Sequence, residues 1–181
     1  MAFSKGNAVV TPIGRLCFSY LTSADERGKY RAEIVFPQGT DISALEAASQ
    51  EVAIAGFGDK EGVSKKIKRG VLTGDRITTE GDPHDDCEGL IRPWTKAREG
   101  GKPSLTFHNI KDLRQHLSTD EVNDLFYDGC LVRARVAPFT YDNDGNKGVA
   151  WFLNALMFAG DAPRIGGGGG DNESSMDAFA A

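Results

Sequence analysis

One long hairpin, expected at residues 131–158, constrains the fold of this chain more than any other feature. Residues 131–141 alternate apolar side chains with Arg, Phe and Tyr, which is the period of a β-strand. The sequence DNDGN at residues 142–146 is a tight-turn signal, and residues 147–158 return as the partner strand. The hairpin predicts that the chain folds around a β-sheet.

Four further segments are expected to be extended. Residues 13–21 and 29–36 are expected to form a hairpin, because the second of them alternates apolar and charged side chains up to Pro37. Residues 90–98 alternate again, and residues 104–110 are a shorter extended segment. About five strands with short helices between them predict a small β-barrel or a curled sheet.

Two helices are expected between these strands. Asp41 is a candidate N-cap, and apolar residues at spacings of three and four continue an amphipathic helix to about Ala55. Ser118 and Glu121 fit a capping box that begins a short helix through about Tyr127. The helices do not alternate regularly with strands, so parallel βαβ units are not indicated.

The end of the chain differs from the rest in composition. Residues 1–163 are expected to form one domain, whereas residues 164–181 contain five consecutive glycines and then mainly small and acidic residues. Such a segment has too little apolar surface to offset chain entropy, so we expect a disordered tail. The formal net charge of −5 includes the tail acids, and a body closer to neutrality can still carry a basic stripe.

Several classes of protein are not indicated by the sequence. The three cysteines have no CxxC spacing, which argues against a disulfide framework or a zinc site. We find no apolar segment of about 20 residues and no secretory signal, so a membrane protein is not expected. Phosphate-binding glycine motifs and a GxSxG nucleophile are absent, so we expect neither a cofactor nor catalysis.

The cluster at residues 83–88 (PHDDCE) has metal-ligand residue types, but a polar surface loop is the simpler interpretation.

Two predicted strand faces combine cations with aromatic rings. They comprise Arg92, Trp94, Lys96 and Arg98 on one strand, and Arg133, Arg135, Phe139 and Tyr141 on the other. A groove that holds single-stranded DNA without reading its sequence needs cations for the phosphates and rings on which bases stack. The alternative is that these residues form the solvated face of a sheet, with Trp94 and Phe139 in the core.

The C-terminal half resembles a family of phage single-stranded DNA-binding proteins. The resemblance rests on Tyr127 and Gly129, on the basic strand that ends in aromatics, on Asn143 to Val149, and on Leu153-Asn154. The opening also fits, through Gly14-Arg15-Leu16, Lys29-Tyr30 and Phe36-Pro37. The resemblance implies an OB-fold, a five-stranded barrel with helical insertions. It further implies single-stranded DNA as the ligand, a replication or recombination role in the cytoplasm of the infected bacterial host, and no enzymatic activity.

This resemblance completes the list of expected site residues. Lys147 is placed beside the turn, and Arg15 and Arg31 at the edge of the groove. The tail is similar to those of replicative single-stranded DNA-binding proteins, which implies docking to phage or host replication proteins through Asp171, Glu173, Asp177 and Phe179. Two alanines follow Phe179, whereas such tails often end at the aromatic, and a merely solubilising tail is the alternative.

Three other functions remain open at this point. A strand-annealing or recombination mediator would use the same basic and aromatic groove. A metal-dependent nuclease would use the cluster at residues 84–88. A virion or scaffold protein would have no affinity for DNA.

Overall fold

The computed structural model describes residues 3–58, 67–73, 87–96 and 105–164. Arg98 and the tail residues Asp171, Glu173, Asp177 and Phe179 lie outside these ranges, so their predicted roles stay predictions.

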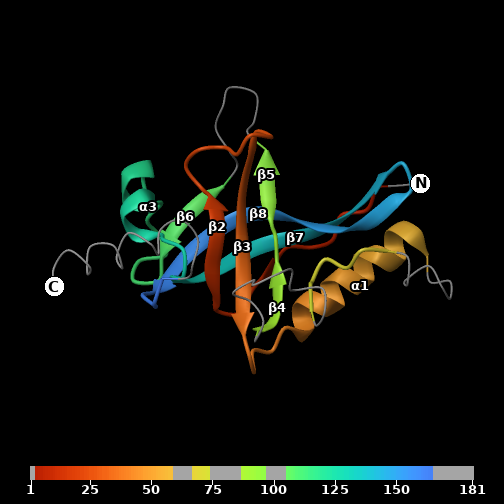
Figure 1. Ribbon diagram of the computed structural model, residues 1–181, viewed down its shortest axis with the longest axis horizontal. Coiled ribbons are helices and arrows are strands. Elements are labelled where there is room, and N and C mark those ends of the chain that lie inside the picture. The colour runs from red at the N-terminus through yellow and green to blue at the C-terminus, as the bar shows by residue number, and fades with distance from the viewer. Residues whose placement is uncertain (1–2, 59–66, 74–86, 97–104, 165–181) are drawn as a thin grey trace, which may run out of the picture.

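Five strands of the described chain close into a barrel (Figure 1). In order around the ring they are β2 (Gly14–Tyr20), β3 (Lys29–Pro37), β5 (Trp94–Lys96), β8 (Asn146–Gly160) and β7 (Leu131–Asn143), which returns to β2. The β5–β8 pair is parallel, and the other pairs around the ring are antiparallel. This ring is the five-stranded OB-fold barrel, so the predicted fold class is confirmed.

Three short strands extend the sheet. β1 (Val9–Val10) pairs with β7, β4 (Cys87–Ile91) pairs with β3, and β6 (Thr106–Asn109) runs parallel to β8. The prediction of one strand over residues 90–98 was wrong, because the chain breaks at Arg92-Pro93 between β4 and β5. Proline has no amide hydrogen to donate to a ladder, which accounts for the interruption.

The barrel core is built from alternate positions of the long strands. Ile34 and Phe36 of β3 are fully buried, as are Val132 and Val136 of β7.

In β8 the alternation of core-facing and outward-facing side chains changes phase at a bulge. Val136 pairs with Leu153 and Arg135 pairs with Ala155, which leaves Asn154 as an extra residue. The bulge lets Trp151 and Leu153 before it, and Leu156 and Phe158 after it, all reach the core.

Helices cover opposite sides of the barrel (Figure 1). Helix α1 (Ser43–Phe57) begins after Ile42 rather than at the predicted cap Asp41. The Asp41 carboxylate instead accepts a hydrogen bond from the Ser43 amide at 3.0 Å, which forms a turn just before the helix. Leu45 and Val52 bury the inner face of α1. No helix in the described part of the chain is long and apolar enough to span a membrane.

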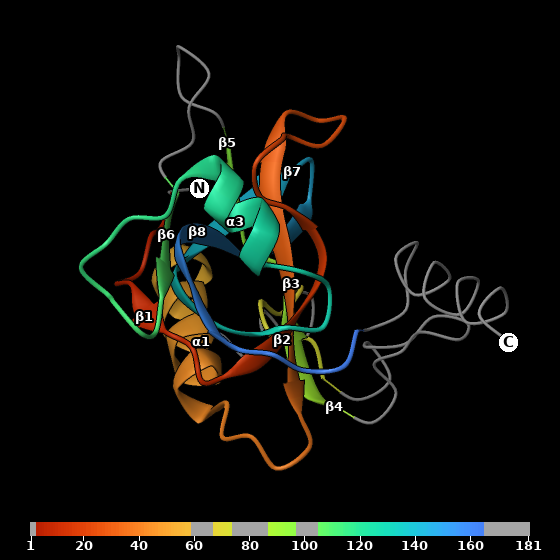
Figure 2. The ribbon, with the colours of Figure 1, turned by 90° about the vertical axis from the view of Figure 1, so that its left-hand side faces the viewer.

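Helix α3 (Thr119–Leu125) lies in front of the barrel strands in Figure 2. Its predicted capping box is confirmed, since the Ser118 hydroxyl accepts from the Glu121 amide and the Glu121 carboxylate accepts from the Ser118 amide. Val122 and Phe126 join the barrel core. The capping box thus fixes the entry of a helix whose inner face seals the core.

The predicted turn of the long hairpin is confirmed. Asp144 and Gly145 both have positive φ angles, 52° and 88°, as a two-residue turn between twisted strands requires. The Asp142 carboxylate accepts a hydrogen bond from the Gly145 amide at 3.0 Å. Beyond the turn, β7 and β8 stay paired from Asn143–Asn146 back to Leu131–Gly160.

Candidate nucleic-acid interface

Three aromatic rings from three strands meet on the outer face of the barrel. Trp94 of β5 lies edge-on to Phe139 of β7 and Phe152 of β8, with centroid distances of 5.7 and 5.8 Å. Phe139 and Phe152 stack at 4.0 Å with an interplanar angle of 22°. Phe152 points outward because it lies between the core residues Trp151 and Leu153 on an alternating strand. We call these three rings the aromatic cluster.

The members of the aromatic cluster differ in exposure. Phe139 is only 6 % exposed, and its neighbours rather than the main barrel core cover it. Trp94 and Phe152 are half-buried and keep ring surface in contact with solvent. Phe139 therefore supports the other two rings, which are the ones available to a ligand.

Cations surround the aromatic cluster. The Lys29 ammonium lies 4.0 Å from the centroid of the Trp94 ring, and that of Lys5 lies 5.3 Å from the Phe152 ring. Lys96 of β5 is exposed and is the direct cross-strand partner of Lys29. Cations within about 6 Å of a ring are attracted to its face, so they remain beside the surface on which a base can stack. Ring faces and positive charges are therefore interleaved.

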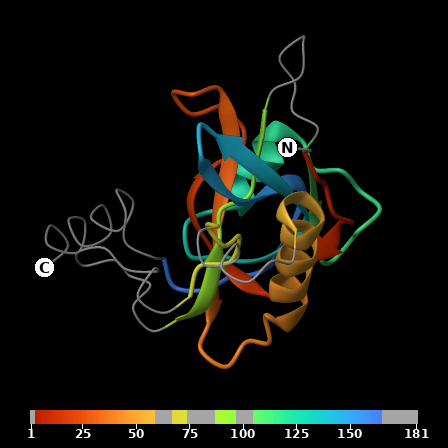
Figure 3. The same cartoon turned by 90° about the vertical axis from the view of Figure 1, so that its right-hand side faces the viewer.

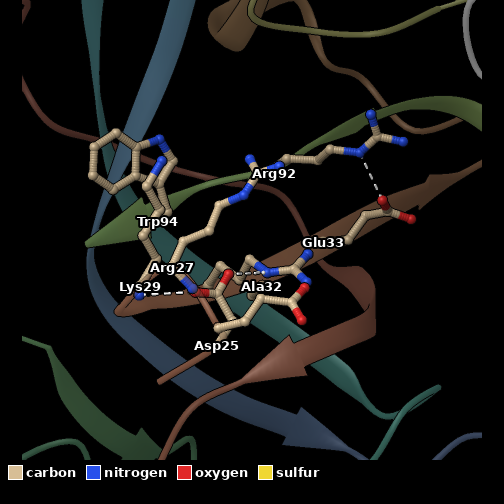
Figure 4. A pocket seen from close by; sticks show the side chains of 9 residues that line it. Asp25, Arg27, Lys29, Ala32, Glu33, Arg92 and Trp94 are labelled. Carbon is tan, nitrogen blue, oxygen red and sulfur yellow. Dashed lines mark hydrogen bonds and ion pairs between the residues drawn. The ribbon is translucent and has the colours of Figure 1, made fainter. Parts of the chain in front are cut away.

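Asp25 organises the turn that leads into β3. Its carboxylate accepts hydrogen bonds from the amides of Arg27 and Lys29, each at 2.9 Å, and from Nε of Arg31 at 2.8 Å (Figure 4). These bonds, above all the one from the Lys29 amide, hold the pKa of Asp25 below its ordinary value. Arg31 also lies over the Tyr20 ring, 4.8 Å from its centroid. The acid thus fixes the positions of two basic residues.

Arg92 and Glu33 form the second ion pair of this region. Nε of Arg92 lies 2.8 Å from Glu33 Oε2, and the Arg92 side chain is 57 % exposed against 9 % for that of Glu33. Both line an open pocket together with Asp25, Arg27, Lys29, Arg31 and Trp94 (Figure 4). The buried Glu33 carboxylate anchors the guanidinium through Nε, and the exposed Arg92 side chain keeps N–H groups that can donate to a phosphate.

The structure brings together some of the predicted site residues and separates others. Arg31, Arg92, Trp94, Lys96 and Phe139 gather around the pocket and the aromatic cluster. Arg133 and Arg135 lie farther along β7, where Nε of Arg133 donates to the Thr11 carbonyl at 2.8 Å and Arg135 pairs with Val10 of β1.

Arg15, predicted at the edge of the groove, and Lys147, predicted beside the turn, lie elsewhere. Arg15 donates to the carbonyl oxygens of Gly129 and Pro163, near the end of the described chain. Lys147 pairs with Asp142, one position beyond the Tyr141–Gly148 pair, so it points to the opposite side of the hairpin from Tyr141. Its ammonium lies 6.0 Å from the centroid of the Phe57 ring at the end of α1.

The cluster at residues 84–88 is only partly described. Cys87 and Glu88 belong to β4 and not to the loop expected there. The Glu88 carboxylate accepts a hydrogen bond from the Gly39 amide at 2.9 Å. Residues 84–86 lie outside the described ranges. Among the residues that the structure describes, no group of three or more His, Cys, Asp or Glu side chains is arranged to hold a metal ion.

Sequence reasoning missed several residues of this face, namely Lys5, Tyr20, Lys29 and Phe152. Lys29 begins the outward face of the alternating β3 segment, and Phe152 alternates with two buried neighbours, so both carried a readable signal. Lys5 carried no such signal in the sequence, because only an isolated bridge to Phe139 brings Lys5 to this face.

The closed five-stranded barrel and its basic, aromatic outer face define an OB-fold, a class that binds oligonucleotides and oligosaccharides. A family model described as Enterobacter phage Enc34, ssDNA-binding protein, matches residues 14–181. The chain belongs to this family of phage single-stranded DNA-binding proteins, so the resemblance noted in the sequence is confirmed.

Solved structures share the fold at low sequence identity. The single-stranded DNA-binding protein from bacteriophage Enc34 is 16 % identical, with a TM-score of 0.68 over 94 % of this chain and 90 % of that one. The same protein in complex with ssDNA is 17 % identical, with a TM-score of 0.68 over 88 % and 89 % of the two chains. The gp2.5 single-stranded DNA-binding protein of bacteriophage T7 is 13 % identical, with a TM-score of 0.57 over 93 % and 94 %. No curated protein matches the sequence of this chain.

Proposed function

We propose that this protein binds single-stranded DNA without sequence preference, through the aromatic cluster and the cations beside it. The observation that carries the proposal is the half-buried Trp94 ring with the Lys29 ammonium 4.0 Å from its centroid. A base can stack on the ring whatever its identity, since every base has a π-face. The adjacent phosphate is neutralised by a lysine, which releases counterions.

We further propose that the protein coats and protects exposed strands during phage DNA replication and recombination, in the cytoplasm of the infected bacterium. Support comes from the family to which the chain belongs and from the Enc34 protein, which was solved in complex with ssDNA. The role proposed is binding without catalysis, and the Enc34 and T7 proteins of similar fold are likewise described as DNA-binding proteins.

The tail is proposed to recruit replication proteins of the phage or the host. Its acids Asp171, Glu173 and Asp177 and the single aromatic Phe179 follow a run of glycines, the composition of a tethered docking peptide. Deletion of residues 165–181 is expected to preserve binding to oligo-dT and to abolish co-sedimentation with the purified phage or host replication proteins that the full chain binds. Equal co-sedimentation of both forms would leave the tail without this role.

Fluorescence-anisotropy titration tests the DNA-binding proposal. The labelled ligands are oligo-dT, a mixed-sequence single strand and the matching duplex, each at low and moderate salt. We expect tight, salt-sensitive binding to both single strands and weak binding to the duplex. Equal affinity for the duplex, or no affinity for any DNA, would reject the proposal and favour a structural role. Cleavage of the single strand in the presence of Mg²⁺ or Mn²⁺ would instead support the nuclease hypothesis.

A further inference from the structure

A second aromatic recess lies next to the aromatic cluster, on the other side of Phe139. Four rings line it, together with polar residues of β7: Phe3, Phe57, Phe139 and Tyr141, with Thr140, Asp142 and Asn143. They come from the N-terminal segment, the last residue of α1 and the end of β7. These three parts lie side by side at one end of the molecule (Figures 1 and 3). We call this site the hairpin recess.

Thr140 positions both walls of the hairpin recess. Its amide donates to the Ser4 carbonyl at 2.9 Å, and its hydroxyl accepts from the Ser4 amide at 2.9 Å, which holds the N-terminal segment on β7. On the helix side, Gly56 packs so closely that a Cβ there would lie 2.7 Å from Thr140 Cγ2. The 2 % exposed Thr140 thus fixes Phe3 on one side and Phe57 on the other.

The aromatic walls are accessible to a ligand. Phe3 is 63 % exposed although its ring lies only 5.9 Å from that of Phe139. Phe57 and Tyr141 are half-buried. Phe139 contributes to both sites, because it lines the hairpin recess and stacks on Phe152 of the aromatic cluster. A strand that stacks on Trp94 therefore meets the hairpin recess as the next aromatic surface in its path.

The charges around the hairpin recess suit a base inside it and a phosphate outside it. Asp142 at its rim repels a phosphate, and its carboxylate is engaged by the Gly145 amide. The Lys147 ammonium lies 6.0 Å from the Phe57 ring centroid. The exposed Lys68 is held next to Lys147, since its amide donates to the Lys147 carbonyl at 2.9 Å. The Lys147 ammonium thus lies beside the Phe57 wall of the recess, on the side of the hairpin opposite Tyr141, and the Lys68 backbone is bonded to that of Lys147.

We propose that the hairpin recess takes one nucleobase of the bound single strand, with Lys147 and Lys68 neutralising the phosphate next to it. This inference rests on the proposed function and extends the binding path from β5 to the end of α1. It also assigns Phe3 a role in binding, although the family match begins at residue 14.

Single substitutions in the full chain test this inference. Phe57→Ala and Phe3→Ala are each expected to weaken binding to an oligo-dT of about 15 nucleotides by about 5- to 150-fold, the range for the loss of one stacked base. Ile54→Ala is the matched control, because Ile54 is 38 % exposed on the same helix and does not line the recess. Phe3→Ala removes an exposed ring, so a thermal melt close to that of the wild type is expected for this variant.

A fluorescent reporter gives a direct readout. In a Trp94→Phe background, Phe57→Trp adds an indole to the recess, while Trp151 remains buried at 1 % exposure. Oligo-dT is expected to quench the new indole. Binding without quenching, together with unchanged affinity of Phe3→Ala and Phe57→Ala, would overturn the inference. A change in the indole signal on deletion of residues 165–181 without DNA would also overturn it, since the tail would then be the occupant.

The two proposals fail in distinguishable ways. If Trp94→Ala weakens binding while the recess variants bind like the wild type, only the hairpin recess is rejected. If the wild type binds no single-stranded DNA, both proposals are rejected together.

Discussion

Lys29 places its ammonium 4.0 Å from the centroid of the Trp94 ring, although the two residues are diagonal neighbours across the β3–β5 pair. In the strand register Trp94 is opposite Arg31, and Lys29 is opposite Lys96. Diagonal neighbours on one face are within reach of long and aromatic side chains. The β3–β5 pair therefore presents one ring among three cations, which is the arrangement that a stacked base and its phosphates require.

Replacing Trp94 removes the principal stacking surface. We expect Trp94→Ala to weaken binding to any single strand by about 1–3 kcal/mol, because one base loses its aromatic partner. Trp94→Phe keeps a ring and is expected to retain most of the affinity. Anisotropy titration with oligo-dT and with a mixed sequence measures both variants.

Thermal unfolding is the control for these variants. A large loss of stability in Trp94→Ala with unchanged DNA affinity would assign Trp94 to the fold and not to the interface. The matched variant Leu113→Ala removes an apolar side chain that is 58 % exposed on a loop between β6 and α3, and it is expected to bind like the wild type.

Lys29 is expected to contribute through charge. In Lys29→Gln, one phosphate contact is lost, so the slope of log Kobs against log salt should become shallower by about 0.7. Lys111→Gln, on the exposed loop after β6, is expected to leave the slope unchanged. Identical slopes for Lys29→Gln and the wild type would place the phosphates elsewhere.

Much of this fold could be predicted from the sequence, because several of its signals are local. The alternation of β3, the DNDGN turn and the Ser118 capping box all express local physics that one segment contains. The break at Pro93 was missed, since the alternation of side chains continues across it even though the backbone pairing does not. The bulge at Asn154 was also missed, because only the pairing of β7 with β8 defines it.

The candidate binding face was less predictable than the fold. Trp94 and Arg92 could be predicted for this face because cations and rings alternate on one segment. Lys147 was expected beside the turn in the same groove as Tyr141, but its position in the register directs it to the opposite face of the hairpin. Lys5 reaches the face through an isolated bridge to Phe139, a residue distant in the sequence, which a pattern read along the chain does not contain.

Gly14 is expected to be essential for the β2–β3 pair. A Cβ at this position would lie 2.6 Å from Ile34 Cγ2 and 3.0 Å from the Val35 carbonyl oxygen. The carbonyl belongs to the strand backbone and cannot move alone, so Gly14→Ala should lower the free energy of unfolding by about 1–3 kcal/mol. Urea denaturation measures the change, and Gln50→Ala on the exposed side of α1 is the control. An unchanged midpoint for Gly14→Ala would contradict this close packing.

The buried thiol of Cys130 makes the free energy of unfolding depend on pH in the alkaline range. Burial, reinforced by the nearby Asp128 and Asp161, raises the pKa of the Cys130 thiol to about 11 from its ordinary 9.0. The folded chain disfavours the thiolate, whereas the unfolded chain does not. The stabilisation that the protonated Cys130 thiol gives the folded chain is therefore complete below the pKa of the thiol in the unfolded chain, and it is lost as the pH rises from about 9 to about 11.

Urea unfolding at about pH 7 and about pH 10 measures this effect. The wild type should lose about 1 kcal/mol more than Cys130→Ala over that interval, since the variant lacks the titrating thiol. The comparison with Cys130→Ala also removes the contribution of tyrosines, whose titration the two proteins share. Equal losses in the two proteins would show that the thiol ionises as easily in the folded chain as in the unfolded one.

The intrinsic fluorescence of Trp94 during titration with oligo-dT tests the central claim most directly. Trp94 is half-buried and Trp151 is 1 % exposed, so a stacking ligand acts on the first of these indoles. We predict that oligo-dT quenches the tryptophan fluorescence in proportion to binding and that added salt reverses the quenching. The Trp94→Phe variant is expected to bind oligo-dT without this quenching. Binding that leaves the tryptophan fluorescence of the wild type unchanged would contradict the assignment of this face as the DNA-binding surface.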